Sequence, residues 1–147
     1  PWNCSDVGQP VVMRRRAAID HVEIFGLDLR GDRAAAADAD LAALRLQDRH
    51  FLEGRFADSR YAARRKNIFL VAVNCTHPAD TCFCVSTGDG PRATEGFDLA
   101  LSELDNGFLV QAGSDAGRAL AARLPLAPVT TAQQQAADRE IEAAARR

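Results

Sequence analysis

The sequence predicts an α/β or α+β protein with a mixed sheet, flanking helices and a β-hairpin at 98–111. Residues 68–73 form an unbroken apolar run, which is typical of a strand buried on both faces. Residues 98–104 alternate with period two, and Asn106-Gly107 then lead into the apolar residues at 108–110 and Gln111. Asn-Gly between apolar runs is a strong hairpin signal because both residues tolerate a positive φ. Helical periodicity over 39–53 is the third observation, but the order of elements does not separate the two classes.

The remaining elements are expected to alternate between short strands and helices with recognisable ends. In chain order they are a strand at 21–25, a helix at 58–66, a strand at 82–85, a helix at 115–123 and a final helix capped by Thr130 or Thr131. Asp58 or Ser59 is the expected N-cap of the second helix, and Gly113-Ser114 the expected cap of the third. The final helix is polar on most faces, so we expect it to need a partner surface that the chain does not supply.

Domain organisation follows from these elements. Residues 1–20 give a poorly defined N-terminal segment, 21–128 a single α/β domain, and 129–147 a C-terminal helix. The chain does not begin with Met and its last residues continue a helical pattern, so we expect it to be part of a longer protein.

Charge and hydropathy exclude several classes of protein. The formal net charge of −2 gives no electrostatic reason to bind nucleic acid or a membrane surface. No apolar run approaches the roughly 20 residues of a membrane span, and no secretory signal is visible. We therefore expect a cytoplasmic protein, and the Ala- and Arg-rich composition indicates a GC-rich bacterial genome.

Three of the four cysteines, Cys75, Cys82 and Cys84, lie within ten residues. Without a secretory context, such a cluster indicates metal binding or redox chemistry more than a disulfide framework. On a strand, Cys82 and Cys84 would share one face about 6.5 Å apart, and Cys75 would lie at the end of the buried strand. We expect the three sulfur atoms to converge on one pocket beside Asp40. The alternative is a set of buried free thiols lining the end of the sheet; zinc is a poorer fit because Cys-x-Cys is too tight.

Other polar residues are weaker candidates. The amides of Gly88 and Gly90 are candidates for holding a phosphate, although their segment lacks the spacing and the Lys of a P-loop and is typical of a plain turn. Arg64 and Arg65 are candidates for an anionic cofactor, or for capping a helix end and pairing with nearby acids. His77 is either a metal ligand or an exposed loop residue. No arrangement for nucleophilic catalysis is present, so no catalytic residue is predicted.

The cysteine segment resembles a known family of bacterial and archaeal proteins. It is similar to the region ahead of the ferredoxin motifs in the β subunits of soluble hydrogenase/sulfur reductase and the A subunits of anaerobic sulfite reductase, the dicluster ferredoxin-domain proteins. The resemblance covers about residues 38–124. The matching segments are Asp40-Leu41-Ala42-Ala43-Leu44 with Asp48, Tyr61-Ala62-Ala63-Arg64-Arg65, Val71-Ala72-Val73-Asn74-Cys75, Thr81-Cys82-Phe83-Cys84, Gly88 to Pro91, and the hairpin from Phe97 to Leu101 and from Phe108 to Val110.

The resemblance implies the N-terminal domain of an iron–sulfur electron-transfer subunit of an oxidoreductase complex. For the three cysteines themselves, the hypothesis is that Cys75, Cys82 and Cys84 are ligands of a 4Fe–4S cluster, with a fourth ligand from Cys4, Asp38, Asp40 or a residue beyond this chain. The family commonly has a cysteine where this chain has Ala39.

The family's downstream ferredoxin cysteines are absent from this sequence, so further clusters are expected only in a missing C-terminal part, toward which the final helix would lead. The implied partners are other redox subunits or that ferredoxin-like domain. The alternative is a metal-free scaffold that docks such a partner and has no activity of its own.

Overall fold

The computed structural model describes residues 11–14, 33–36 and 38–146, with side chains from residue 41 onward. Within these residues, one six-stranded sheet has the order β2-β3-β4-β5-β1-β6. The strands are β1 (Val11–Arg14), β2 (Arg33–Ala36), β3 (Phe69–Val73), β4 (Leu99–Leu104), β5 (Gly107–Ala112) and β6 (Ala127–Pro128). Neighbours β2, β3 and β4 run parallel, whereas β4, β5, β1 and β6 pair antiparallel. The predicted mixed α/β fold is therefore confirmed.

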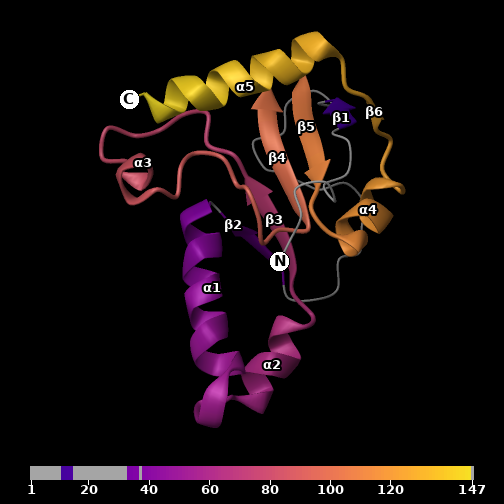
Figure 1. Ribbon diagram of the computed structural model, residues 1–147. Helices are drawn as coiled ribbons and strands as arrows, with labels where there is room; N and C mark the ends of the chain where they lie inside the picture. The colour runs from indigo at the N-terminus through magenta and orange to yellow at the C-terminus, as the bar shows by residue number, and fades with distance from the viewer. Residues whose placement is uncertain (1–10, 15–32, 37, 147) are drawn as a thin grey trace.

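The helices flank this sheet (Figure 1). They are α1 (Asp38–Leu52), α2 (Ser59–Arg65), α3 (Cys84–Thr87), α4 (Asp115–Ala121) and α5 (Thr131–Ala145), with a 3₁₀ turn at Gly54–Phe56 between α1 and α2. Figure 1 shows α1 and α2 extending away from the sheet as a helical pair and α5 lying across β4 and β5. No helix within the described part of the chain is long and apolar enough to cross a membrane.

The expected helix caps are present. Asp58 Oδ1 accepts hydrogen bonds from the backbone N–H groups of Arg60 and Tyr61 at 2.7 and 3.2 Å. Ser114 caps α4 by accepting from the Gly117 N–H at 3.0 Å. Thr130 and Gln133 form a reciprocal capping box at the start of α5. These short polar contacts satisfy backbone donors that have no partner inside their own helix.

The predicted hairpin is confirmed, with its turn one residue earlier than expected. Leu104 pairs with Gly107, so the two turn residues are Asp105 and Asn106, and Gly107 is the first residue of β5. This register places Leu101 opposite Val110, and both side chains are buried. We infer that buried pairing across the strands outweighs the turn preference of Asn-Gly.

Two other expectations have different outcomes. The predicted strand at 82–85 is wrong, because Cys84–Thr87 form the short helix α3. Its end is closed by Gly88 in a left-handed conformation (φ 82°), and the N–H groups of Asp89 and Gly90 donate to the Cys84 carbonyl. The glycines therefore close a tight turn, which an extended strand does not permit. The predicted strand at 21–25 lies outside the described residues.

The core has two parts, on opposite faces of the sheet, because alternate residues of β3 and β4 contribute to each. The first face packs under α1 and contains Leu41, Leu70, Ala72, Ala93, Phe97 and Ala100. The second packs against α4 and contains Val71, Leu99, Leu101, Val110 and Ala112. The sheet is thus covered on both sides around β3, as its continuous apolar sequence predicts.

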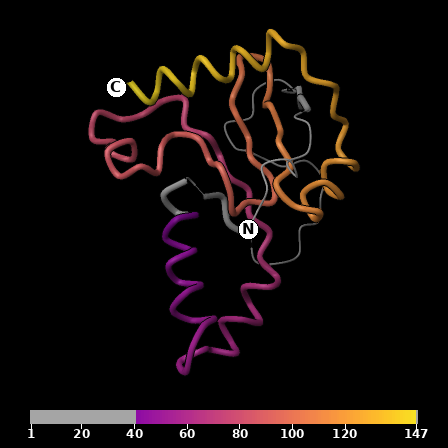
Figure 2. Tube along the Cα trace, in the orientation of Figure 1, coloured from indigo at the N-terminus to yellow at the C-terminus, as the bar shows by residue number. Residues whose placement is uncertain are grey.

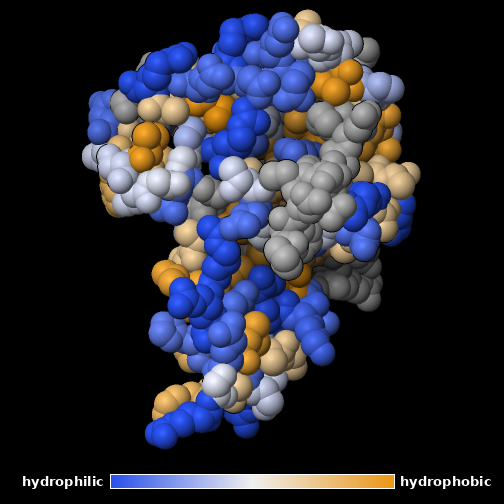
Figure 3. Space-filling model, viewed as in Figure 1, coloured by the Kyte–Doolittle hydropathy of each residue, from blue (hydrophilic) through white to orange (hydrophobic). Residues whose placement is uncertain are grey.

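The final helix has its partner surface within the chain, so the expectation of a missing partner is wrong. Helix α5 buries Ala137, Ile141 and Ala144 and packs on β4 and β5. The outer surface of the molecule along α5 is hydrophilic (Figure 3). A helix with a narrow stripe of small apolar residues can therefore pack closely on the sheet while most of its surface stays in water.

Candidate functional site

The three cysteines lie on the long connection from β3 to β4. Figure 2 traces this connection out past α3 and back to the sheet. Cys75 comes two residues after β3, and its N–H donates to the Pro91 carbonyl at 2.8 Å. This hydrogen bond closes the loop formed by residues 75–91. Because β3 and β4 are parallel neighbours, the chain must return to the far end of the sheet, and the segment carrying the cysteines is part of that return.

All three cysteines line one cavity of about 270 Å³, which we call the thiol pocket. Its other walls come from the same connection and from the end of α5: Pro78, Ala79, Asp80, Phe83, Val85, Ser86, Pro91, Ala144, Ala145 and Arg146. Phe83 and Val85 are exposed large apolar residues, and hydrophobic surface is visible in the region of α3 in Figure 3. The structure therefore places the three thiols at one site, at an open and partly apolar surface.

The thiols of the pocket are free side chains that differ in exposure. Among the described residues, no group of three or more His, Cys, Asp or Glu side chains is placed to hold a metal ion. The three cysteines are free, with Cys82 exposed and Cys75 and Cys84 half-buried. Cys82 Sγ accepts a hydrogen bond from the Ala79 N–H at 3.2 Å. Cluster ligation by these thiols stays a prediction, whereas the exposure of Cys82 contradicts a set of wholly buried thiols.

The first described turn of α1 lies close to the base of the thiol pocket. Leu41 packs in the same buried cluster as Ala93, and Ala93 follows two residues after Pro91, the partner of Cys75. Figure 1 shows the N-terminal end of α1 directed toward the β3–β4 connection. The side chains of Asp38, Ala39 and Asp40, like Cys4, are outside the described side chains, so their contacts with the cysteines remain predictions.

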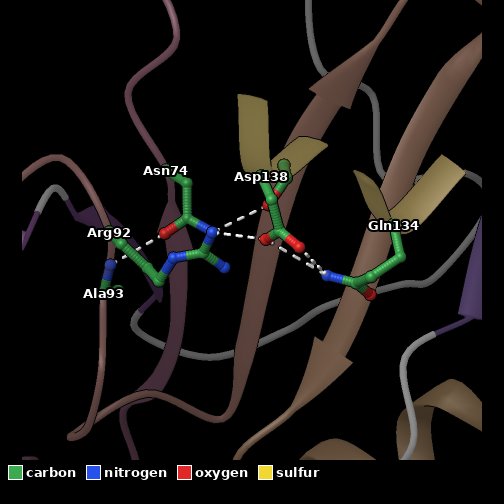
Figure 4. A network of polar contacts seen from close by, with 6 residues as sticks. Asn74, Arg92, Ala93, Gln134 and Asp138 are labelled. Atoms are coloured by element: carbon green, nitrogen blue, oxygen red, sulfur yellow. Dashed lines mark hydrogen bonds and ion pairs between the residues drawn. The ribbon is translucent and has the colours of Figure 1, made fainter. Parts of the chain in front are cut away.

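A polar network beside the pocket was not identified from the sequence. Asn74 is buried, donates from Nδ2 to Ser102 Oγ and accepts from the Ala93 N–H, both at 2.8 Å. Arg92, which directly precedes Ala93, pairs with Asp138 of α5 at 2.5 Å (Figure 4). Gln134 also donates to Asp138, at 3.3 Å. The one signal in the sequence is a polar Asn placed directly between a buried strand and Cys75.

The backbone amides of Gly88 and Gly90 form hydrogen bonds within their own turn. The Gly88 N–H donates to the Val85 carbonyl at 3.2 Å, and the Gly90 N–H donates to the Cys84 carbonyl at 3.3 Å. Both glycines have positive φ, 82° and 53°. Because these amides are bonded within the turn, they do not form the cradle of free donors that a phosphate needs.

The two arginines of α2 differ in their surroundings. Arg65 Nε lies 3.0 Å from both carboxylate oxygens of Asp48, and the Tyr61 hydroxyl donates to Asp48 Oδ1 at 2.7 Å. Arg65 lines a second cavity, whereas Arg64 is exposed and is not on its wall. Burial raises the pKa of Tyr61, the hydrogen bond to Asp48 and its negative charge raise it further, and the Arg65 charge lowers it.

His77 is exposed, and its Nδ1 lies 2.9 Å from Thr76 Oγ1. It is absent from the wall of the thiol pocket in the described structure. The hypothesis that His77 is a ligand beside Cys75 therefore finds no support in the geometry.

Comparison with known proteins gives one partial likeness. Residues of this chain are 40% identical over 78 positions to the protein named sulfhydrogenase 2 subunit beta of Pyrococcus furiosus. The match covers 53% of this chain and 22% of the relative, so the chain spans about a fifth of that protein's length. No family model matches the sequence. No solved structure matches it.

Proposed function

We propose that this chain is a domain of an electron-transfer subunit of a hydrogenase-type oxidoreductase complex. The observation that supports it most is the placing of three free cysteines around one pocket in a chain 40% identical over 78 residues to a sulfhydrogenase β subunit. Free thiols gathered at one site, outside any disulfide framework, favour metal or redox chemistry. Since the likeness covers 22% of the relative, the activity of the whole complex is part of the proposal.

Within this function, Cys75, Cys82 and Cys84 are the proposed protein ligands of a 4Fe–4S cluster. Such a cluster is held by four protein ligands in the ordinary case and exchanges single electrons. The fourth is proposed to come from Cys4, Asp38, Asp40 or a residue beyond the chain. Each thiolate would bind a different iron atom of the cluster, so ligation does not require the three sulfur atoms to surround a single metal ion.

The proposed partners follow from the same likeness. They are other redox subunits of the complex or a downstream ferredoxin-like domain that holds further clusters. We propose a cytoplasmic location for the complex.

The test is the metal content of the protein purified without oxygen. Wild type is expected to retain iron and acid-labile sulfide and to show the broad visible absorption of an iron–sulfur cluster. Cys82→Ser is expected to lower all three readouts, while Ser86→Ala, which removes another polar side chain of the same pocket, is expected to leave them unchanged. Equal iron in wild type and Cys82→Ser would show that these thiols are not ligands.

A metal-free scaffold is the second candidate. It is favoured by the internal hydrogen bond of Cys82 Sγ and by the absence of a ligand cage among the described residues. A colourless, iron-free wild type that still binds a ferredoxin-like partner would establish the scaffold and remove the cluster from this chain.

A further inference from the structure

We propose that the second cavity, remote in sequence from the cysteines, binds a small oxyanion through Arg45 and Lys66. The cavity holds about 430 Å³. Its wall is built from α1, the end of α2, the start of β3, the segment before β4 and the cap of α4: Arg45, Arg65, Lys66, Ile68, Leu70, Glu95, Gly96, Phe97, Asp98 and Ser114. We call it the basic pocket. This inference does not depend on the proposed function, because it involves none of the cysteines.

Cationic groups reach the basic pocket from two helices. Arg45 comes from α1, and Arg65 and Lys66 come from the end of α2 and the residue after it. Arg65 is already held by Asp48 through its Nε. Its charge is therefore compensated by Asp48, and Arg45 and Lys66 are the cations proposed to contact a ligand.

The carboxylates of the wall are engaged to different degrees. Asp98 Oδ2 accepts from the Leu70 N–H at 2.7 Å, and Asp98 Oδ1 accepts from the Ser114 hydroxyl at 2.5 Å. Both oxygens of Asp98 thus have donors that belong to the fold. Glu95 forms an ion pair with Arg45, with Nη1 and Oε1 at 3.1 Å and more than 40% of each side chain exposed. That exposed pair can open at small cost, because solvent screens it.

Arg45 has unmet hydrogen-bonding capacity. Its Nη1 is buried and has no hydrogen-bond partner among the described residues, even though Glu95 Oε1 is near. Nη1 can lie 3.1 Å from Oε1 without a hydrogen bond if its N–H bonds do not point at Oε1, because a hydrogen bond needs alignment as well as distance. A buried guanidinium nitrogen without an aligned acceptor is unfavourable, and an oxyanion supplies the acceptor.

The wall determines the class of ligand. The charges of Arg45, Arg65 and Lys66 are balanced by the carboxylates of Glu95, Asp98 and Asp48, the last of which pairs with Arg65. With no net charge at the pocket, a ligand of low charge is favoured, and the donors of Arg45 and Lys66 select an oxyanion. Ile68, Leu70 and Phe97 line the same cavity and favour a ligand with a small apolar body. The shared chemistry is therefore a carboxylate or phosphate oxyanion, and the probes are benzoate, which has an apolar ring, and inorganic phosphate, which has none.

The experiment titrates the full chain with each probe in solution and monitors the backbone amide chemical shifts by NMR at every addition. We expect saturable shifts at Gly96 and Ser114, which line the pocket. Arg45→Gln and Lys66→Gln are each expected to weaken binding by about tenfold or more, since each removes a charged donor. Arg64→Gln is the matched control, because Arg64 lies on the same helix as Arg65 but off the wall, and its affinity should equal that of wild type.

Glu95→Gln gives an independent test that survives if Arg45→Gln fails to fold. It removes the competing carboxylate from Arg45 and should tighten binding of whichever probe binds. Tighter benzoate than phosphate binding in wild type assigns a carboxylate ligand, and the reverse assigns a phosphate. No saturable shift with either probe, or equal weakening in Arg64→Gln and Arg45→Gln, would overturn the site.

Discussion

The Asn74 side chain joins β3 to β4 through a 2.8 Å hydrogen bond from its Nδ2 to Ser102 Oγ. Only 4% of Asn74 and 2% of Ser102 are exposed, so water does not replace this contact. The Asn74 Oδ1 accepts from the Ala93 N–H, and its backbone N–H donates to Leu101. One residue therefore fixes the end of β3, the middle of β4 and the returning connection, directly before Cys75.

Asn74→Ala is expected to lower the free energy of unfolding by about 1–3 kcal/mol, because it leaves the buried Ala93 N–H without an acceptor. Chemical denaturation measures the change. Asn67→Ala is the matched control: its side chain is exposed and makes one bond, to Ala63 O at 3.2 Å. Similar losses in the two variants would show that burial of the Asn74 network adds nothing.

The ion pair between Arg92 and Asp138 links the connection to α5 (Figure 4). Both side chains are 38% exposed, so screening limits the coupling energy to about 0.2–1 kcal/mol in a double-mutant cycle with Arg92→Gln and Asp138→Asn. The pair between Arg118 and Asp115, in which Asp115 is 98% exposed, is expected to give a smaller coupling. If the coupling energy of Arg92 with Asp138 is as small as that of Arg118 with Asp115, the Arg92–Asp138 ion pair does not help to hold α5 on the connection.

Tyr61 is expected to make stability fall at high pH. Burial and the hydrogen bond to Asp48 raise its pKa in the folded protein above the ordinary value of about 10. The folded state thus holds the proton longer than the unfolded state. This contribution is complete below the unfolded pKa and is lost as the pH rises through the folded pKa.

Because Tyr61 is the single tyrosine of the sequence, phenolate absorbance follows its titration directly. Asp48→Asn should move the measured pKa down toward the ordinary value, and Arg65→Gln should move it up. In Tyr61→Phe, the fall of unfolding free energy above pH of about 10 should be shallower. An unchanged pKa in Asp48→Asn would exclude this assignment.

Ala39→Cys tests the proposed cluster from the side of its missing ligand. A sulfur near the start of α1 should raise the iron and sulfide retained after anaerobic reconstitution, since a helix N-terminus stabilises a nearby thiolate. Leu41 belongs to the same buried cluster as Ala93, which follows two residues after Pro91 of the thiol pocket, and this favours the placement. If Cys4 is the fourth ligand instead, Cys4→Ala should abolish retention and Ala39→Cys should change little. With neither variant altering iron content and none bound by wild type, the scaffold remains.

The sequence was sufficient where local chemistry determines structure. The interior strand β3 and the Ser114 cap were identified, and the caps of α2 and α5 were narrowed to two neighbouring residues each, of which Asp58 and Thr130 are the ones used. Capping and an unbroken apolar run depend on neighbours along the chain. The hairpin turn was misplaced by one residue, because the pairing of Leu101 with Val110 is a property of two strands and not of the turn.

The candidate site was predicted less well, for the same reason. Strand parity placed Cys82 and Cys84 on one face, but the turn closed by Gly88 makes Cys84 the start of a helix. The three thiols nevertheless share a pocket, because the Cys75–Pro91 hydrogen bond brings the two ends of the segment together. Asn74, Arg45 and their partners depend on contacts between distant segments, which no single-sequence spacing reveals.

The parallel pairing of β3 with β4 also has a kinetic consequence. The β4–β5 hairpin closes over two residues, whereas β3 meets β4 only after the whole intervening segment has been looped. Loop-closure entropy therefore favours early hairpin formation and late parallel pairing. Substitutions in the hairpin should mainly change the folding rate and those in the cysteine segment the unfolding rate. Cys75, Cys82 and Cys84 would then become ordered after the hairpin, and they stay open to iron or to oxidants until β3 has paired with β4.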